Sequence, residues 1–441
     1  MSVPGRTRTG LRDGTARPSS GKRPGRCLPI EGVQDAKRNL GFSRGSPPTA
    51  THARTAGVTW DQVVAFRLSR HFLLDRAPAR ALTTVVRAMA GAQAQVVSAA
   101  HLSLWARVHD LRPEDVQAAV HARVLVRAWC MRRTLHLVPS RDLAVFIRGT
   151  ARRAEREIRW MCGKGVTEGE LDTLIGAALD ALDRPITGRE LVDRVARSLG
   201  VRVRAMRWGG WGSAAKIPGV AVGRVTVPAR YLLTLAGARG VVCLGPSRGV
   251  EPTHVRADAW IPRWRDLPQK DAERRLLRWY LRAFGPATPA DFARWAGMTL
   301  SDARKIWAWE ETDIASVTVE GWPAAVLEND LRPLRAGGTE PSPVRLLPYF
   351  DSFLLGHEVR AHLVAARHHK RVYRTQGWIA PVVLVNGRVA GLWAHAREGR
   401  RLRVSVTRFG ALSRDAVAGI RDEADRLGRF LGGLDVDVQI A

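Results

Sequence analysis

The spacing of apolar side chains along residues 58–139 changes from helical to strand-like. Apolar positions recur every three to four residues in four successive segments, which predicts four helices. These segments are residues 60–71 behind an N-cap at Thr59, residues 79–90, the run after Gln95, and the run that starts at Pro113. The period then shortens to two over residues 124–129 and 134–139, which predicts two short strands. Helices followed by a hairpin are the outline of a winged helix, a helix-turn-helix with a β wing.

The same outline recurs twice further along the chain. Helices are predicted over residues 185–200 and 286–297, because each opens with Pro, an N-cap Thr and an acid three residues later. After Gly297 another helix runs to Trp309, and a hairpin follows over residues 314–328. A helix, a glycine turn and a second helix are what a helix-turn-helix requires. The chain is therefore predicted to hold three helix-turn-helix-plus-hairpin units.

Beyond a Gly- and Pro-rich linker at residues 331–343 the pattern is mainly that of strands. Asn386-Gly387 marks a type I′ hairpin turn, and an amphipathic helix is expected over residues 413–431. Strands are expected at residues 344–355, 372–374, 378–385, 388–394, 402–407 and 436–440. The predicted fold class is α+β, with three tandem winged-helix units followed by a C-terminal β-rich domain. The predicted parts are a disordered basic tail at 1–56, winged helices at 57–150, 151–268 and 269–335, and the β-rich domain at 343–441.

The net charge of +29 gives information about the partner of the protein and not about its fold. Seven of the 70 basic residues are lysine, so 63 are arginine, whose forked guanidinium matches phosphate oxygens. A charge this large indicates a polyanion as partner, and nucleic acid is the default. An anionic membrane surface is the weaker competitor, because no strongly amphipathic basic helix stands alone.

Other classes of site are not indicated. The four cysteines are scattered singly without a CxxC pair, so neither a zinc site nor a disulfide framework is expected. No cofactor or metal is predicted. The chain has no run of about 18 apolar residues and no secretory signal, and loose thiols fit a reducing compartment, so a cytoplasmic protein with no membrane partner is expected.

The stretch Gly91-Ala92-Gln93-Ala94-Gln95 carries the candidate chemistry. Residues two apart share a face of a strand or extended turn, but not of a helix. The two amides can therefore converge only if the backbone is a helix end or a bend. A convergent pair of glutamines can hold a water or read a base edge. The competing interpretation is a pair of solvated amides at a helix terminus.

Four segments in this order resemble the tandem winged-helix DNA glycosylases, the AlkZ-type proteins of azinomycin resistance and their YcaQ-like relatives. They are GAQAQ at residues 91–95, LSLWAR at 102–107, MRRTLHLVP at 131–139 and LLPYFD at 346–351. The resemblance covers residues 58–441. It implies a C-shaped basic DNA-binding surface, excision of N7-alkylated purines and unhooking of interstrand crosslinks.

The resemblance also implies which residues act. The family's motif of Gln, a bulkier apolar residue, then Gln or Asp falls on Gln93 and Gln95, with the smaller Ala94 between them. Thr134 and His136 match the family's wing motif. Five residues are candidates either for contact with DNA or for support of the site: Thr134, His136, Arg132, Arg133 and Asp351.

The chemistry suits neutral amides. An N7-alkylated purine is cationic and already a good leaving group, so the glycosidic bond breaks through an oxocarbenium-like state with little need for a general acid. The amides can orient the attacking water, whereas a carboxylate would extend the range to poorer leaving groups. The expected enzyme is a monofunctional, monomeric DNA glycosylase acting on double-stranded, alkylated or crosslinked DNA. The alternative is a non-catalytic winged-helix DNA-binding protein or transcription regulator.

Overall fold

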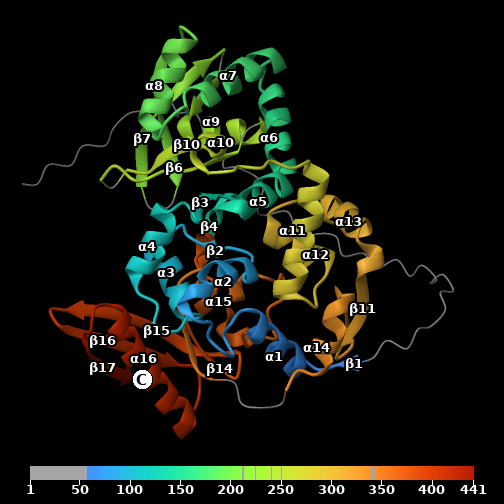
Figure 1. Ribbon diagram of the computed structural model, residues 1–441, viewed down its shortest axis with the longest axis vertical. Helices are drawn as coiled ribbons and strands as arrows, with labels where there is room; N and C mark the ends of the chain where they lie inside the picture. The colour runs from blue at the N-terminus through green and yellow to red at the C-terminus, as the bar shows by residue number, and fades with distance from the viewer. Residues whose placement is uncertain (1–56, 211–212, 224, 240, 250, 339–342) are drawn as a thin grey trace, which may run out of the picture. The chain divides into compact units, whose positions relative to one another are not determined.

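The computed structural model describes residues 57–210, 213–223, 225–239, 241–249, 251–338 and 343–441. The basic tail expected at residues 1–56 lies outside the described residues. Among the described residues, helices and sheets alternate along the chain, so the fold is mixed α and β (Figure 1).

The first segment follows the predicted order of helices and hairpin. Its helices are α1 (Trp60–Arg70), α2 (Leu82–Ala88), α3 (Val97–Trp105), α4 (Pro113–His121) and α5 (Leu143–Gly149). Its sheet has the order β2-β4-β3, from β2 (Ala92–Gln93), β4 (Leu135–Pro139) and β3 (Leu125–Trp129). Thr59 caps α1 as expected, because its side chain accepts from Gln62 N while the Gln62 side chain accepts from Thr59 N.

The second segment is larger and holds two small sheets. Its helices are α6 (Arg152–Cys162), α7 (Glu168–Asp180), α8 (Gly188–Ser198), α9 (Ala229–Arg239) and α10 (Ala257–Trp260). One sheet has the order β5-β10-β9, from β5 (Ile186–Thr187), β10 (Thr253–Arg256) and β9 (Val242–Leu244). The other has the order β6-β7-β8, from β6 (Val203–Gly210), β7 (Ser213–Val222) and β8 (Val225–Pro228). The expected capping box at Thr187 and Glu190 is present.

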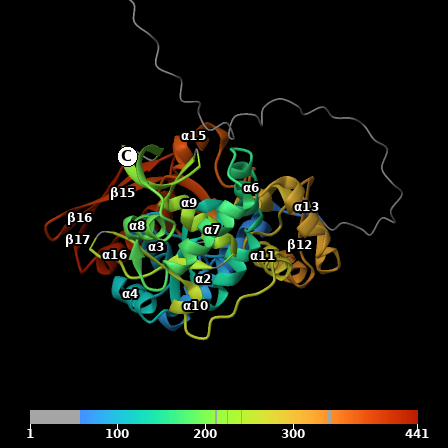
Figure 2. The ribbon, with the colours of Figure 1, turned by 90° about the horizontal axis from the view of Figure 1, so that it is seen from above.

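The third segment contains the predicted pair of helices around a glycine turn. Its helices are α11 (Gln269–Phe284), α12 (Pro289–Ala296), α13 (Leu300–Ala308) and α14 (Leu331–Arg335). Gly297 adopts the left-handed conformation, φ 78°, that ends α12. Strands β11 (Ile314–Val319) and β12 (Trp322–Leu327) form the expected hairpin, and α11, α13 and this hairpin lie together in both ribbon views (Figures 1 and 2).

The first strand of the chain belongs to the sheet of the third segment. Strand β1 (Gly57–Val58) runs parallel to β11, with Val58 beside Val319. Trp60 N also donates to Glu320 Oε1 at 2.9 Å, across 260 residues of sequence. The start of the described chain is therefore held by β11 and Glu320 of the third segment.

The C-terminal segment is a five-stranded sheet with one long helix. The sheet order is β13-β14-β15-β16-β17, from β13 (Arg345–Leu347), β14 (Val382–Val385), β15 (Arg388–Glu398), β16 (Arg401–Arg408) and β17 (Asp435–Ile440). Helix α16 (Arg414–Phe430) connects the parallel neighbours β16 and β17. Asn386 and Gly387 both have positive φ, as the predicted type I′ turn requires.

Several expected boundaries in this part are wrong. The strand expected over 344–355 ends at Leu347, because Phe350 has a positive φ and the chain then turns into a short 3-10 helix. Residues 372–374 are not a strand: Val372 ends helix α15 (His369–Val372), and Tyr373 makes a single bridge to Ile379. The expected linker begins with α14, and its residues 339–342 lie outside the described residues.

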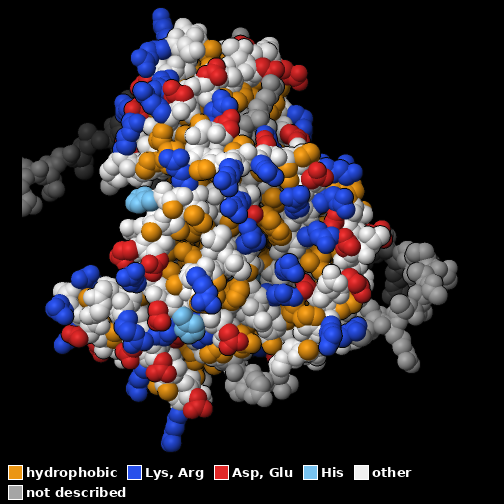
Figure 3. All heavy atoms as spheres, in the orientation of Figure 1, with side chains coloured by type: hydrophobic (Ala, Val, Ile, Leu, Met, Phe, Trp, Pro, Cys, Tyr) orange, Lys and Arg blue, Asp and Glu red, His pale blue; other side chains and the backbone are white. Residues whose placement is uncertain are grey.

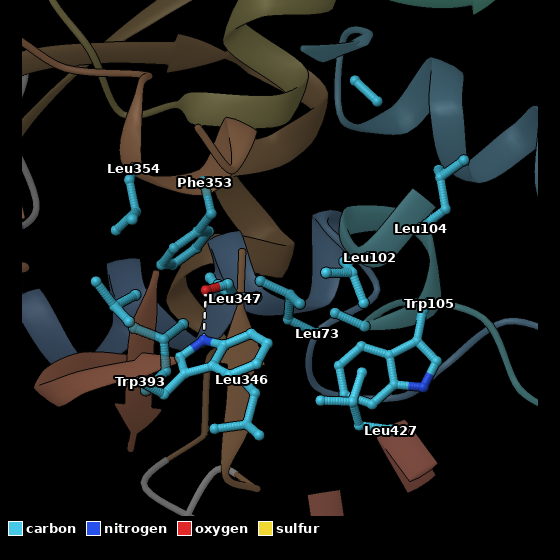
Figure 4. Close-up of a cluster of buried hydrophobic side chains, with 14 of the residues drawn as sticks. Leu73, Leu102, Leu104, Trp105, Leu346, Leu347, Phe353, Leu354, Trp393 and Leu427 are labelled. Carbon is cyan, nitrogen blue, oxygen red and sulfur yellow. Dashed lines mark hydrogen bonds between the residues drawn. The ribbon is translucent and has the colours of Figure 1, made fainter. Parts of the chain in front are cut away.

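The largest buried cluster joins the first segment to the C-terminal segment. Trp105 and Leu73 pack with Leu346, Phe353 and Leu427, and the Trp393 Nε1–H donates to Leu347 O at 2.8 Å inside the same cluster (Figure 4). Burial of this apolar surface is the dominant favourable contribution to folding. Residues 64–137 and 344–434 therefore share one core.

A buried ion pair crosses this core. Arg107 donates from both Nη atoms to the Asp351 carboxylate, at 2.8 and 2.7 Å, and both side chains are 0% exposed. Asp351 also accepts from the Ser103 hydroxyl and from Phe353 N. Burial raises the pKa of Asp351, but Arg107 and these donors outweigh burial and hold it below its usual value.

The Asp351→Asn variant tests this pair. Asn keeps the shape but leaves the Arg107 charge uncompensated in the core, so we expect a loss of about 3–5 kcal/mol in the free energy of unfolding. Urea denaturation monitored by circular dichroism measures it. Asp425→Asn, at an exposed site in α16, is the matched control and should change stability by less than about 0.5 kcal/mol. Equal losses in the two variants would contradict a structural role for the pair.

Buried histidines make stability depend on pH. Burial is the main cause that lowers the pKa of His71 and His136 to about 3, of His254 to about 4 and of His362 to about 2, and it lowers that of His357 well below 6.5. Below pH 6.5 the unfolded chain therefore binds protons that the folded chain excludes. Stability is complete above about pH 6.5 and falls as the pH drops, by about 1.4 kcal/mol per pH unit for each such histidine.

Thermal unfolding between pH 7.5 and 5 tests this expectation. The melting temperature should fall steeply below pH 6.5. A His357→Gln variant, which keeps a donor for Phe284 O, should show a shallower slope than the parent, whereas His121→Gln at an exposed site should not. A melting temperature independent of pH in this window would contradict the linkage.

Candidate active site

Gln93 and Gln95 lie on the edge of the β2-β4-β3 sheet. Gln93 pairs with His136, and Ala94 N donates to Leu135 O at 2.7 Å. Strand β2 covers only Ala92–Gln93, and Gln95 lies in the bend that follows, one of the two backbone conformations that the sequence suggested. Ala94, between the two glutamines, is 2% exposed and belongs to the buried core.

The hairpin holds both amides by their oxygens. Gln93 Oε1 accepts from Arg132 Nη2 at 3.0 Å, and Gln95 Oε1 accepts from Leu135 N–H at 3.2 Å. Each donor requires the oxygen and not the NH₂ group of the amide, which determines the orientation of both side chains. Gln93 is buried and Gln95 is exposed, so the pair extends from the core to the surface.

The backbone before Gln93 is held from two sides. Gly91 has φ 91°, and a Cβ there would lie 3.1 Å from Val138 Cγ1, so only glycine is accommodated without a shift. On the other side the Ser352 hydroxyl donates to Gly91 O at 2.8 Å. The LLPYFD segment, next to Ser352, therefore supports the strand that carries the glutamines.

His136 supports the site without reaching solvent. It is 2% exposed, and its Nδ1 donates to Thr134 O at 2.9 Å, which leaves Nε2 as an acceptor facing Arg132 Nη2 at 3.4 Å. Burial, followed by the charge of Arg132, lowers the pKa of His136 to about 3. The imidazole is neutral at physiological pH and receives a hydrogen bond from Arg132.

Arg132 connects the glutamines to the third segment. Its Nη1 donates to Trp295 O at the end of α12, while its Nη2 donates to Gln93. A Cβ on Gly297 would lie 2.8 Å from Arg132 Cα, so the turn after α12 packs directly on the arginine's backbone. Burial and the charges of Arg360 and Arg294 lower the pKa of Arg132 to about 10, so it remains a cation at neutral pH.

The remaining candidates take supporting positions. Arg133 forms an ion pair with Glu157 of α6 and lies over the Tyr231 ring at 5.7 Å. The Thr134 hydroxyl donates to Met131 O at 3.1 Å within the turn. Asp351 is fully buried against Arg107, so of the two roles left open by the sequence it can serve only as support.

A basic cleft lies beside Arg132. Lysine and arginine side chains spread over the face shown in Figure 3. The apolar residues that line the cleft include Trp129, Leu233 and Val242. Its basic lining residues are Arg132, Arg133, Arg153 and Arg230.

Sequence reasoning missed the contacts that bring distant segments to the glutamines. Nothing in the spacing links Trp295 O or Ser352 to residues 91–95. The available signal was Gly297, whose place after a capped helix indicated a tight turn but not its partner. In the ranges that the structure describes, no group of three His, Cys, Asp or Glu side chains could hold a metal ion, and no helix is long and apolar enough to cross a membrane.

Comparison with known proteins gives one consistent result. The family model for AlkZ-like DNA glycosylases matches residues 86–430. An interstrand DNA cross-link repair glycosylase of Streptomyces sahachiroi is 32% identical over 392 residues, covering 87% of this chain and 99% of that protein.

A solved structure agrees with the sequence comparison. The Streptomyces sahachiroi DNA glycosylase AlkZ superimposes with a TM-score of 0.73 at 28% identity, covering 88% of this chain and 100% of that chain. The family match, the identity and the shared fold extend over the segments that hold Gln93, His136 and Asp351. The chain belongs to the AlkZ-like DNA glycosylase family.

Proposed function

We propose that this protein hydrolyses the N-glycosidic bond of N7-alkylated purines in double-stranded DNA, and that it unhooks interstrand crosslinks formed through such adducts. The observation that carries the proposal is the pair of amides two residues apart, each oriented by a hydrogen bond that its oxygen accepts from residues 132–135. The cross-link repair activity named for the Streptomyces sahachiroi relative supports the substrate class.

The amides position water in the proposed reaction. Each amide oxygen has a second lone pair, which can accept a hydrogen bond from the water that attacks C1′. No carboxylate forms a hydrogen bond with Gln93 or Gln95 in the described part of the chain. The site therefore holds no obvious general base, which suits a leaving group that is already cationic. Lesions with neutral bases should be poor substrates.

The proposed binding mode follows the fold. We assign the three helix-and-hairpin segments as tandem winged-helix units that hold the duplex, with the C-terminal sheet as a separate β-rich part of the same monomer. The net charge of +29 supports a polyanionic substrate, because counterion release drives association with DNA. We therefore expect the affinity for DNA to fall steeply as the salt concentration rises.

Substitution of the glutamines tests the catalytic assignment. Gln93→Ala and Gln95→Ala should each lower the single-turnover release of N7-methylguanine by about two orders of magnitude, because the attacking water loses an oriented acceptor. DNA affinity should stay within about threefold. Gln117→Ala, an exposed glutamine in α4, is the matched control.

Two results would contradict the proposal. Unchanged release by the purified Gln93→Ala/Gln95→Ala double variant would remove the catalytic assignment. Absence of release by the parent protein, together with a palindromic footprint and a dimeric mass, would favour the transcription-regulator alternative.

The Gly297→Ala variant tests whether the third segment orients the site through Arg132. The added Cβ would lie within 3 Å of the Arg132 backbone, so the turn or the arginine must move, and base release should fall about tenfold or more. Gly165→Ala isolates the clash, because Gly165 has a similar positive φ, 87°, but no atom within 4 Å of the added Cβ.

In both variants the free energy of unfolding should fall by about 1 kcal/mol, because alanine is strained at a positive φ. The loss of activity should be confined to Gly297→Ala. Equal activities of the two variants would show that this packing does not control the glutamines.

A further inference from the structure

Basic side chains from four separate parts of the chain gather around Arg132, which contacts Gln93. Arg132 comes from the turn between β3 and β4, Arg294 from α12, Arg360 from the loop that follows Leu355, and His369 from α15. Their elements are joined by direct contacts rather than by sequence. This convergence forms what we call the arginine cluster, defined as Arg132, Arg294 and Arg360.

Hydrogen bonds and ring contacts fix the elements of the cluster. Arg132 Nη1 donates to the carbonyl of Trp295, the residue after Arg294. Glu358 N donates to Asp291 Oδ1 at 2.8 Å, which ties the loop that carries Arg360 to α12. The Arg360 guanidinium lies 4.0 Å from the centre of the Tyr373 ring. The His369 ring is in turn 4.8 Å from that of Tyr373.

The cluster carries positive charge without a carboxylate partner. In the described residues none of the three arginines forms an ion pair, whereas Arg107, Arg76 and Arg152 each do. The two oxygens of nearby Asp291 are already engaged by Thr288 and by Glu358 N, and Glu358 itself is exposed. Arg360 Nε donates to His357 O at 2.9 Å, and Asp291 and Glu358 are near enough to oppose the lowering of the pKa of Arg360 by burial without pairing with it. The cluster therefore keeps guanidinium donors for a further anion.

The electrostatics agree with this geometry. Besides burial, Arg360 and Arg294 lower the pKa of Arg132, and Arg294 also lowers that of Arg360. Arg360 and Arg132 are half-buried and Arg294 is exposed, so the cluster opens to solvent on the side of Arg294. An anion arriving there would relieve the mutual repulsion of three cations.

We propose that Arg132, Arg294 and Arg360 bind one phosphodiester of the DNA backbone beside the glutamines, and that this contact orients Gln93 through the Arg132 hydrogen bond. Guanidinium groups match the oxygens of a phosphodiester in a forked geometry. The orientation of Gln93 by this contact rests on the proposed function, whereas the phosphate contact itself does not. Arg294 and Arg360 serve as phosphate contacts, whereas Arg132 both contacts the phosphate and positions Gln93.

The position of the cluster beside Gln93 favours a phosphate of DNA over a free ion. Arg132 Nη2 is 3.0 Å from Gln93 Oε1, so an anion held by Arg132 lies next to the amide that positions the attacking water. A phosphate flanking the damaged nucleotide meets both groups at once. Binding of that phosphate would restrict the guanidinium, and with it the Gln93 amide, only when substrate is present.

Salt dependence of DNA affinity provides the first test. Arg294→Gln and Arg360→Gln should each weaken binding to an undamaged duplex about tenfold and reduce the slope of log Kd against log salt by about one. Arg414→Gln, an exposed arginine on α16, is the charge-matched control. Losses no larger than the control's would overturn the proposal. Lesion-free DNA keeps this result independent of base release.

Methylphosphonate substitution identifies the phosphate. Neutral methylphosphonates are placed singly along a duplex with a central N7-methylguanine. At one position beside the lesion, the parent protein should lose about tenfold in affinity while Arg294→Gln and Arg360→Gln lose nothing further. Full additivity at every position would overturn a direct contact. A structural role would not produce this non-additivity at a single position.

Kinetics distinguish positioning from binding. At saturating DNA, Arg132→Gln should lower the single-turnover rate, Arg132→Lys should restore it only in part, and the control Arg414→Gln should leave it within about threefold. An unchanged rate in Arg132→Gln would overturn the positioning role. If the parent releases no base while the methylphosphonate result holds, the proposed function fails and the phosphate contact stands.

Inorganic phosphate distinguishes the source of the anion. At equal ionic strength, sodium phosphate should displace DNA no better than sodium chloride. Displacement by phosphate that disappears in Arg360→Gln would instead assign the cluster to a free anion and overturn the DNA assignment.

Discussion

Pairing between β2 and β4 is the interaction on which the candidate site depends. It places Gln93 opposite His136 and brings the turn at residues 131–133 beside the amide. Without that register, Leu135 N and Arg132 Nη2 would meet different groups, since a slip of one residue sends every side chain to the other face. The register itself is set by the core, because Ala92, Ala94 and Leu137 are buried on the opposite side.

Elements with strong local signals could be predicted from the sequence. The caps at Thr59, Thr187 and Thr288 are read from three-residue spacings, and each is present as a capping box. The Asn386-Gly387 turn depends only on the two residues that form it. Such features need no knowledge of partners distant in sequence.

Features that depend on tertiary contacts could not be predicted in the same way. The strand at Ala92–Gln93 is two residues long and carries no period of its own, since its partner at residues 136–137 supplies the hydrogen bonds. Likewise, the strand expected over 344–355 stops at Leu347, because the chain turns at Phe350, which has a positive φ, and Asp351 then meets Arg107 in the core. The pair Gln93 and Gln95 was identified by resemblance, but the hydrogen bonds that orient it required the fold.

The parallel pairing of β1 with β11 has a consequence for how the chain is made. Val58 finds its partner, Val319, only after some 260 residues of intervening chain, the separation that also divides Trp60 from Glu320. During synthesis β1 therefore stays unpaired until the third segment has been made. Contacts of such long sequence separation slow folding because loop closure precedes their stabilisation. Docking of β1 is thus expected to be a late step in folding, one that completes the sheet of the third segment.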